Sequence, residues 1–180
     1  RVAWSFRLHG AEARVLDGGW QTWTDEGRPV VADTTARDAG AFTARVRTQL
    51  LRTVDDVAMV AATGGALIDA RPRHVYVGEV GVPGTGHIPG ALSLPYHDLV
   101  DGATGIFATP AAIGRLLRDA GLDPAHPPRH LIASCGVGVS ATVALIALEL
   151  AGVFGTGVYD GSFSEWSADP GRPIAYGAGG

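Results

Sequence analysis

The stretch "LIASCGVGVSATVALIALELAG" (residues 131–152) carries the only cysteine of the chain, Cys135. An apolar run precedes this cysteine, two glycines punctuate the residues that follow it, and a long apolar segment comes next. This order predicts a buried strand over 130–134, a tight loop, and a helix over 139–151 that ends at Gly152. We therefore expect Cys135 at the carboxyl end of a strand, just before the N-terminus of a helix.

The chain on both sides of this stretch has the same alternating character. Short apolar runs between glycine or proline residues predict two more buried strands, and runs with helical spacing predict helices between them. The strands are expected at 66–71 and 157–159, and the helices at 53–63, at 110–121 and from 162 onward. Strands that alternate with helices predict an α/β domain in which helices flank a mostly parallel sheet.

The predicted strand ends gather polar and reactive side chains at one edge of this sheet. Asp69, Arg71 and Cys135 all come at the carboxyl ends of predicted strands, where parallel sheets bind their ligands. Gly136 and Gly138 allow the loop after the cysteine to curl so that backbone N–H groups point inward. Such a cradle, with the helix N-terminus behind it, binds anions and favours a thiolate.

Two interpretations of Cys135 remain open at this point. A lone cysteine is often a buried small hydrophobe, whereas a position before a glycine-rich turn is typical of a nucleophile. Among nucleophilic chemistries, phosphatases with a similar loop need an arginine six positions after the cysteine, and Ala141 occupies that place. The chain has no CxxC motif for dithiol chemistry, and a histidine partner for the cysteine is not identifiable from the sequence.

Composition excludes several classes of function. The net charge of −4 does not favour binding to nucleic acid or to an anionic membrane. One cysteine excludes an internal disulfide, and the six histidines have no spacing typical of metal ligands. The chain does not start with a signal-peptide pattern, and Glu149 interrupts its longest apolar segment. We expect a cytoplasmic protein without a bound metal.

An internal repeat divides the chain. "VLDGGWQTWTDEGRPV" (residues 15–30) matches "VYDGSFSEWSADPGRPI" (residues 158–174), and the second copy has more than a hundred residues before it. We therefore expect residues 1–30 to be the tail of a truncated first repeat, 31–47 a linker and 48–176 a catalytic domain. The apolar side chains of the first segment would then lack most of their core; they are Trp4, Phe6, Leu8, Trp20 and Trp23.

The ordered motifs resemble the C-terminal part of a two-domain rhodanese-like sulfurtransferase. The motifs are "LIDAR" (67–71), "GHIPGA" (86–91), the loop of Cys135 and "YDGSFSEWSADPGRPI" (159–174). The resemblance implies a persulfide on Cys135, formed from a small anionic donor and passed to a thiol or to cyanide, with no cofactor. It also implies the residues that bind the donor and stabilise the sulfur, namely Arg71, Gly136, Val137, Gly138, Val139 and Ser140.

The loop sequence bears on the donor. A neutral "CGVGVS" is nearer to the loop of members that use 3-mercaptopyruvate than to the basic loop of members that use thiosulfate. Val137 stands where the family has a hydroxyl residue, and Val75 and Val77 stand near the places of its donor-binding arginines. These differences leave an alternative from another class, a catalytically silent rhodanese-like module that binds a partner protein.

Overall fold

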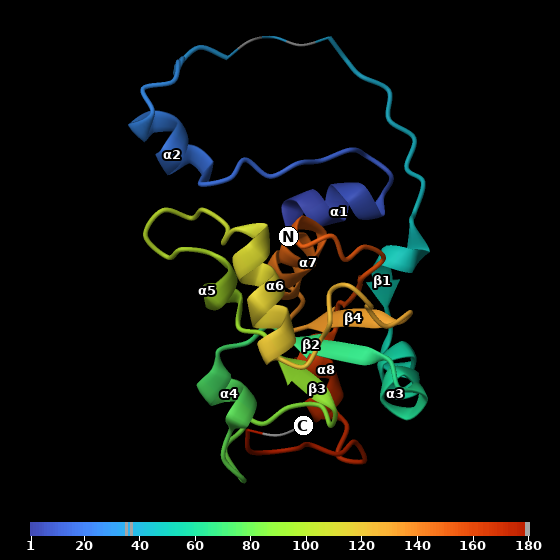
Figure 1. Cartoon of the computed structure of the whole chain (residues 1–180). Helices are drawn as coiled ribbons and strands as arrows, with labels where there is room; N and C mark the ends of the chain where they lie inside the picture. Colours follow the sequence, from blue (N-terminus) through green and yellow to red (C-terminus); the bar gives the residue numbers. More distant parts are fainter. Residues whose placement is uncertain (35, 37, 179–180) are drawn as a thin grey trace.

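A five-stranded sheet in the order β1-β5-β4-β2-β3 forms the centre of the molecule (Figure 1). The computed structural model describes residues 1–34, 36 and 38–178. Every pairing between neighbouring strands is parallel, so the prediction of a mostly parallel sheet is confirmed, and no described strand is antiparallel. The strands are β1 (Leu51–Arg52), β2 (Ala66–Asp69), β3 (Ala91–Ser93), β4 (Leu131–Ser134) and β5 (Gly157–Tyr159).

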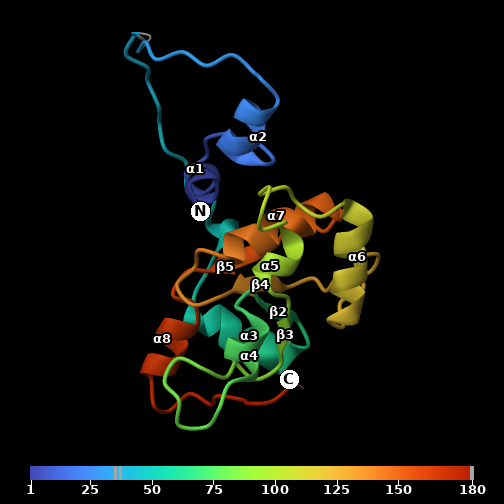
Figure 2. The ribbon, with the colours of Figure 1, turned by 90° about the vertical axis from the view of Figure 1, so that its left-hand side faces the viewer.

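Two layers of helices cover the sheet. Figure 2 shows α3, α4 and α8 on one side of the strands, and α5, α6 and α7 on the other. The short segments α1, α2 and η1 precede the first strand. The bounds are α1 (Val2–Leu8), α2 (Gly19–Asp25), η1 (Thr48–Leu50), α3 (Val54–Thr63), α4 (Arg73–Val77), α5 (Tyr96–Leu99), α6 (Pro110–Asp119), α7 (Ala141–Leu150) and α8 (Ser162–Ala168).

Local signals account for where the flanking helices begin. At α3 the Thr53 hydroxyl accepts the Asp56 N–H at 3.3 Å, and the Asp56 carboxylate accepts the Thr53 N–H at 2.8 Å. This reciprocal capping box satisfies two backbone donors that a helix otherwise leaves unpaired. At α6, Thr109 caps the helix and Pro110 occupies its first turn. The predicted helices over 53–63 and 110–121 are therefore confirmed.

Two helices differ from the prediction. Helix α7 begins at Ala141 rather than at 139, because residues 136–140 turn around the side chain of Cys135. Helix α4 covers Arg73–Val77, where no helix is expected from the sequence. Pro72 is the N-cap residue of α4, and its ring fixes its own φ, at −52°, just before the helix begins.

Two apolar clusters hold the layers together. The first lies between the sheet and α5–α7, and the second lies between the sheet and α3, α4 and α8. β4 is buried along its whole length, as expected for a central parallel strand covered on both faces. Fully buried residues of the two clusters include Ile113, Leu117, Leu145 and Leu148 in the first, and Val57, Ile88 and Tyr159 in the second.

The N-terminal segment packs on the domain more closely than the sequence predicts. Trp4 and Leu8 are buried in the cluster that contains α7, so the expectation that they lack a core is wrong. Arg7 donates to both carboxylate oxygens of Glu149, which joins α1 to α7. Phe6 remains exposed, because it lies on the face of α1 that points away from α7.

The two copies of the repeat make the same local contacts. In the first copy, the Trp23 indole N–H donates to the Pro29 carbonyl at 3.0 Å, and Arg28 lies over the Trp23 ring. In the second, the Trp166 indole N–H donates to the Pro173 carbonyl at 2.8 Å, and Arg172 lies over its ring. Trp166 is buried in the core, whereas Trp23 is only half-buried and Trp20 is 65% exposed.

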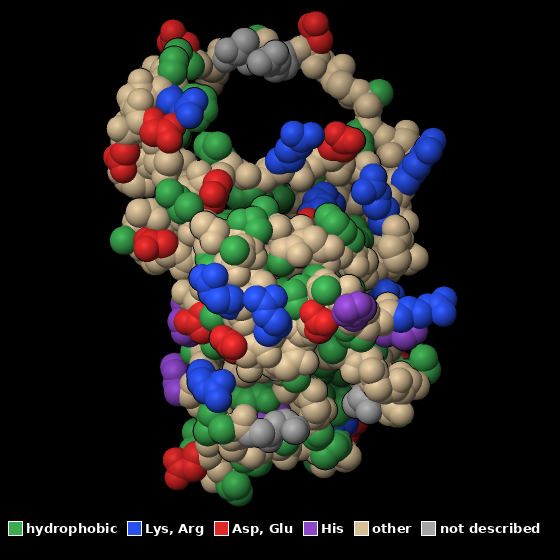
Figure 3. All heavy atoms as spheres, in the orientation of Figure 1, with side chains coloured by type: hydrophobic (Ala, Val, Ile, Leu, Met, Phe, Trp, Pro, Cys, Tyr) green, Lys and Arg blue, Asp and Glu red, His purple; other side chains and the backbone are tan. Residues whose placement is uncertain are grey.

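The segment between the repeats has no helix or strand among its described residues from 31 to 47. Residues 35 and 37 of the predicted linker lie outside the described part. The two sides of the segment form an arch over an opening, which is visible in the ribbon and in the space-filling view (Figures 1 and 3). The arch returns to α1, where the N–H groups of Arg45 and Arg47 donate to the carbonyls of His9 and Leu8.

The described residues contain no helix that is long and apolar enough to cross a membrane.

Candidate functional site

Cys135 lies at the carboxyl end of β4, and its side chain is buried. The register pairs Asp69 with Ser134, so β2 and β4 end at the same level and Asp69, Arg71 and Cys135 come to one edge of the sheet. The Cys135 carbonyl accepts the N–H of Phe163 at 2.9 Å, which fixes the loop to the start of α8. The cysteine is therefore held between two successive strand-to-helix connections.

The loop that follows Cys135 directs hydrogen-bond donors at its sulfur. Burial raises the pKa of the Cys135 thiol, but four hydrogen bonds to the sulfur outweigh burial, and the pKa lies below its ordinary value. The donors are the hydroxyl of Ser140, the N–H groups of Ala141 and Val137, and the hydroxyl of Ser162. A thiolate is thus stabilised inside a largely dry site, which is the state a sulfur nucleophile needs.

Ser140 and Val137 contribute through different groups. Ser140 is the N-cap residue of α7, yet its hydroxyl makes no capping hydrogen bond, and its interaction with the sulfur helps to lower the pKa of Cys135. Val137 contributes its backbone N–H, while its side chain is 64% exposed. The Val139 side chain is also exposed, at 52%. The loop therefore presents backbone donors inward and an apolar rim outward.

Ser162 is the residue of this site that sequence reasoning missed. It is fully buried, and it is the one non-glycine residue with a positive φ, 53°, in the described part of the chain. Its Oγ accepts the N–H groups of Cys135 at 3.2 Å and of Gly138 at 3.0 Å. Its own proton has two acceptors within reach, the Tyr159 carbonyl at 2.7 Å and the Cys135 Sγ at 3.9 Å. The signal in the sequence was the "DGS" turn between a strand and a helix.

This contact corrects the expected role of one loop residue. The resemblance implies that all backbone N–H groups from Gly136 to Ser140 are available to a bound sulfur, but the Gly138 N–H is already bonded to Ser162. The Gly136 carbonyl accepts the N–H of Ser164, so this residue too is bound to the start of α8. Both glycines shape the loop, and only part of the loop's donor set remains free.

Most of the Arg71 guanidinium group is hydrogen-bonded to other groups of the protein. It forms a buried ion pair with Asp69, with Nε at 3.0 Å from both carboxylate oxygens and Nη2 at 2.5 Å from one. It also donates to the carbonyls of Gly84 and Gly86, and it lies over the Phe163 ring at 3.9 Å. Arg71 thus joins the loop before β3 to Phe163, whose N–H donates to the Cys135 carbonyl.

The side chains on and beside α4 lie in different environments. Val75 and Val77 are half-buried in α4, and Arg73 at its start is exposed. His87 is buried and stacks on Tyr76 with ring centroids 3.8 Å apart, and its Nδ1 pairs with the Tyr76 carbonyl. No group of His, Cys, Asp and Glu residues in the described part of the chain is arranged to hold a metal ion.

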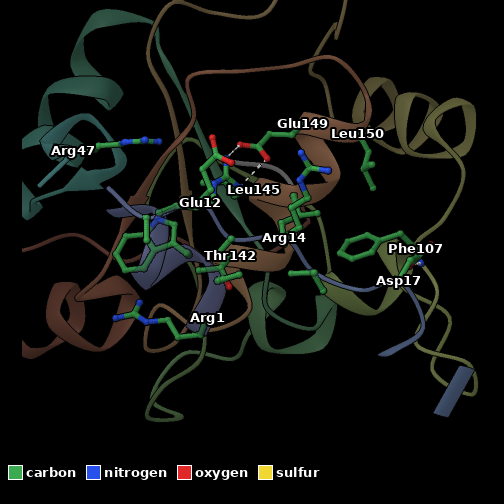
Figure 4. A pocket seen from close by; sticks show the side chains of 17 residues that line it. Arg1, Glu12, Arg14, Asp17, Arg47, Phe107, Thr142, Leu145, Glu149 and Leu150 are labelled. Atoms are coloured by element: carbon green, nitrogen blue, oxygen red, sulfur yellow. Dashed lines mark hydrogen bonds and ion pairs between the residues drawn. The ribbon is translucent and has the colours of Figure 1, made fainter. Parts of the chain in front are cut away.

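A cleft of about 470 Å³ lies between the N-terminal segment and α7. Figure 4 shows Arg1 and Thr142 at one end of it, and Phe107 and Leu150 at the other. Arg1 also touches the cysteine loop, because its Nη1 donates to the Gly138 carbonyl at 3.0 Å. The cleft therefore ends beside the loop that surrounds the sulfur.

Comparisons with known proteins converge on one family. A model of the rhodanese-like domain matches residues 48–169. The chain is 32% identical over 173 residues to thiosulfate sulfurtransferase of Mus musculus, covering 92% of this chain and 57% of that protein. It is 30% identical over 187 residues to 3-mercaptopyruvate sulfurtransferase of Mus musculus, covering 99% and 62% respectively. The chain thus spans about three-fifths of the length of these relatives.

A solved structure has the same fold over nearly the whole chain. It is EanB carrying a cysteine persulfide, in a tetrahedral intermediate state with ergothioneine. It superposes with a TM-score of 0.84 at 25% sequence identity, covering 98% of this chain and 45% of that chain. The similarity includes the N-terminal segment as well as the domain that holds Cys135.

Proposed function

We propose, from the fact that this chain belongs to the rhodanese-like domain family, that it transfers a sulfane sulfur through a persulfide on Cys135. The Cys135 thiolate attacks the outer sulfur of thiosulfate, a new S–S bond forms, and sulfite leaves with the electrons of the old bond. With 3-mercaptopyruvate the C–S bond breaks, and pyruvate leaves after taking a proton. A thiol or cyanide then takes the outer sulfur and releases the thiolate, in a ping-pong mechanism.

The observation that carries this proposal is the set of donors around the sulfur. A buried thiol with its pKa held below the ordinary value is a thiolate source in a site from which water is largely excluded. The names of the two mouse relatives support the transfer of sulfur. The cysteine persulfide of EanB supports the covalent intermediate.

Each loop residue has a distinct part in the proposal. The N–H groups of Val137 and Ala141 and the hydroxyl of Ser140 stabilise first the thiolate and then the outer sulfur of the persulfide. Gly136 and Gly138 allow the turn, and the exposed Val137 and Val139 side chains form the rim that the donor passes. Arg71 acts on the site through Phe163 and the loop at 84–86 rather than as a free anion clamp.

The domain arrangement follows from the repeat. We propose that residues 1–30 form the tail of a first rhodanese-like unit, that 31–47 link the units, and that 48–176 form the catalytic unit. The matching indole contacts of Trp23 and Trp166 support the common origin of the two tails. The burial of Trp4 and Leu8 against α7 supports a contact between the units beside the cysteine loop.

Intact-mass measurement after exposure to each donor tests the catalytic proposal. Incubation with thiosulfate, and separately with 3-mercaptopyruvate, should add the mass of one sulfur, which cyanide should then remove. Cys135→Ser is the control and should gain nothing. If neither donor loads the wild-type protein while the mouse thiosulfate and 3-mercaptopyruvate sulfurtransferases load under the same conditions, the proposed function is wrong.

A second candidate function rests on the same loop. The exposed apolar rim of Val137 and Val139, and the commitment of Arg71 to Asp69, favour a silent module that binds a partner protein. Such a module would not take up sulfur from either donor. The two candidates therefore predict opposite results in the loading experiment.

A further inference from the structure

We infer that Arg1 is a positioning residue for the Cys135 loop: it holds the Gly138 carbonyl, and so leaves the Val139 N–H on the opposite side of that peptide as a further donor for a sulfur bound to Cys135. This inference rests on the proposed function for its consequence in sulfur transfer. Its structural part concerns the free thiol alone. The chain segment that supplies Arg1 lies outside the residues matched by the rhodanese-like domain, which are 48–169.

Gly138 is held from two sides. Its N–H donates to the Ser162 hydroxyl at 3.0 Å, and its carbonyl accepts from Arg1 Nη1 at the same distance. The residue has φ of 73°, a conformation that L side chains rarely adopt, and a Cβ here would lie 2.7 Å from the Asp160 carbonyl. The position therefore requires glycine. Because glycine has no side chain to restrict the backbone, the peptide after Gly138 can rotate unless a contact holds the Gly138 carbonyl.

Because the peptide group is planar, a contact that fixes the Gly138 carbonyl also fixes the direction of the Val139 N–H. In a trans peptide the carbonyl of one residue and the N–H of the next point in opposite directions, and the described residues contain no cis peptide. The Arg1 contact keeps the Gly138 carbonyl on the outer side, so the Val139 N–H faces the other way. Within the described part of the chain this N–H has no protein acceptor. It therefore lies, without an acceptor among the described residues, on the side of the peptide opposite to Arg1, where we assign it to the sulfur.

The opposite orientation of this peptide would oppose the chemistry. A rotated Gly138 carbonyl would direct its negative end into a loop that otherwise points donors at Cys135. A carbonyl oxygen beside a thiolate disfavours the charged form and raises the thiol pKa. The Arg1 hydrogen bond thus decides whether one peptide of the cradle helps or hinders the sulfur.

Arg1 is itself held in place. Its Nη1 lies 2.5 Å from the Asp160 carboxylate, and its guanidinium lies over the Trp4 ring at 4.5 Å. Trp4 is 4% exposed and belongs to the core that contains α7. The charged groups around this end of the loop are Arg1 from the N-terminal segment, Asp160 from the turn after β5, and the Asp69–Arg71 pair at the end of β2.

Two arginines of the N-terminal segment make a matched pair of variants. Arg1→Ala removes the bond to Gly138, whereas Arg7→Ala removes the pair with Glu149 and leaves the loop untouched. The rate of Cys135 alkylation by iodoacetamide, measured between about pH 5 and 10, reports the thiol pKa without any sulfur donor. We expect Arg1→Ala to raise that pKa by about one unit, which slows alkylation about tenfold below the pKa, and Arg7→Ala to leave it unchanged.

Two more variants keep the test decisive where Arg1→Ala fails to fold. Arg1→Lys retains a cationic donor and should restore much of the rate. Asp160→Asn loosens Arg1 but also removes a negative charge beside the loop, which by itself lowers the thiol pKa, so the readout for this variant is the Val139 amide. In amide NMR spectra the Val139 signal should move as Cys135 ionises in the wild type, move less in Asp160→Asn, and be largely restored in Arg1→Lys.

Three outcomes separate the proposals. A thiol pKa that is equal in the wild type and in Arg1→Ala overturns the role of Arg1, whatever the sulfur-loading result. Equal shifts in Arg1→Ala and Arg7→Ala overturn it as well, because they would show that anchoring α1 matters and the Gly138 carbonyl does not. A shift that occurs in Arg1→Ala, is largely reversed in Arg1→Lys and is absent in Arg7→Ala supports it, even where the wild type takes up no sulfur and the proposed function fails.

Discussion

The Ser162 hydroxyl lies 3.9 Å from the Cys135 Sγ, although 27 residues separate the two in the chain. The same oxygen accepts the N–H groups of Cys135 and Gly138, so one side chain from the β5–α8 turn holds both ends of the tightest part of the cysteine loop. Its positive φ of 53° shows that the turn is shaped to put the hydroxyl there.

Replacement of Ser162 separates the hydroxyl from the backbone conformation. Ser162→Ala leaves two buried N–H groups without an acceptor, at about 1–3 kcal/mol each in free energy of unfolding, and it keeps the strained φ. Ser162→Gly loses the same hydrogen bonds but relieves about 1 kcal/mol of strain. We expect urea unfolding to rank the wild type above Ser162→Gly, and Ser162→Gly above Ser162→Ala. An alanine variant as stable as the glycine variant would contradict this account.

Stability should vary with pH through the Cys135 thiol. Because hydrogen bonds hold its pKa below the ordinary value in the folded state, the thiolate stabilises the fold above the unfolded pKa of about 8.5, and this contribution is lost as the pH falls through the folded pKa. The free energy of unfolding of the wild type minus that of Cys135→Ser should therefore rise with pH across this window and then level off. A difference that is independent of pH would show that the thiol is not perturbed.

The Asp69–Arg71 pair should behave as a unit. Both side chains are buried, so Arg71→Ala leaves an unpaired carboxylate in the interior and should reduce the free energy of unfolding by about 3–5 kcal/mol. The double variant Asp69→Asn with Arg71→Met removes both charges and should be the more stable of the two. Chemical denaturation of the wild type, Asp69→Asn, Arg71→Met and this double variant completes the cycle, and additive effects would rule out the coupling.

The N-terminal segment offers a matched pair of tryptophans. Trp4 is 4% exposed and lies in the core with α7, so Trp4→Ala should reduce the free energy of unfolding by about 3–5 kcal/mol. Trp20, on α2, is 65% exposed, and Trp20→Ala should change it by no more than about 0.5 kcal/mol. Thermal and urea unfolding provide the comparison. Equal effects at the two positions would mean that α1 is not packed on the catalytic unit.

The sequence alone predicts the class of the fold and the place of the nucleophile. Short apolar runs between glycines, helical spacing and the Thr53 and Pro110 starts are local signals, and they correctly predict β2, β4 and β5 and the helices over 53–63 and 110–121, but not the short strand β1. The strand before Cys135 and the helix after it are local signals too. Together with the alternation of strands and helices they place the cysteine at the carboxyl edge of a parallel sheet.

The sequence does not predict which loop donors are free. Gly138 is one of two equivalent glycines in the pattern, but its N–H is bonded to Ser162 from another turn and its carbonyl to Arg1, more than a hundred residues away in the chain. The same applies to Arg71, whose ion pair and carbonyl contacts depend on how the loop at 84–86 folds back. Nothing in the local pattern specifies these partners.

The sequence by itself thus determined the alternation of strands and helices, the repeat, and Cys135 as the candidate nucleophile, because these depend on spacing and on residue type along the chain. Only the tertiary structure decided that Trp4 is buried, that Ser162 supports the cysteine loop, and that Arg1 holds its carbonyl. The physical reason is that hydrogen bonds and burial are satisfied between segments brought together by packing. The Cys135 sulfur at the end of β4 is surrounded by donors from its own loop, which are close in the sequence, and by Ser162, which only the fold brings to it.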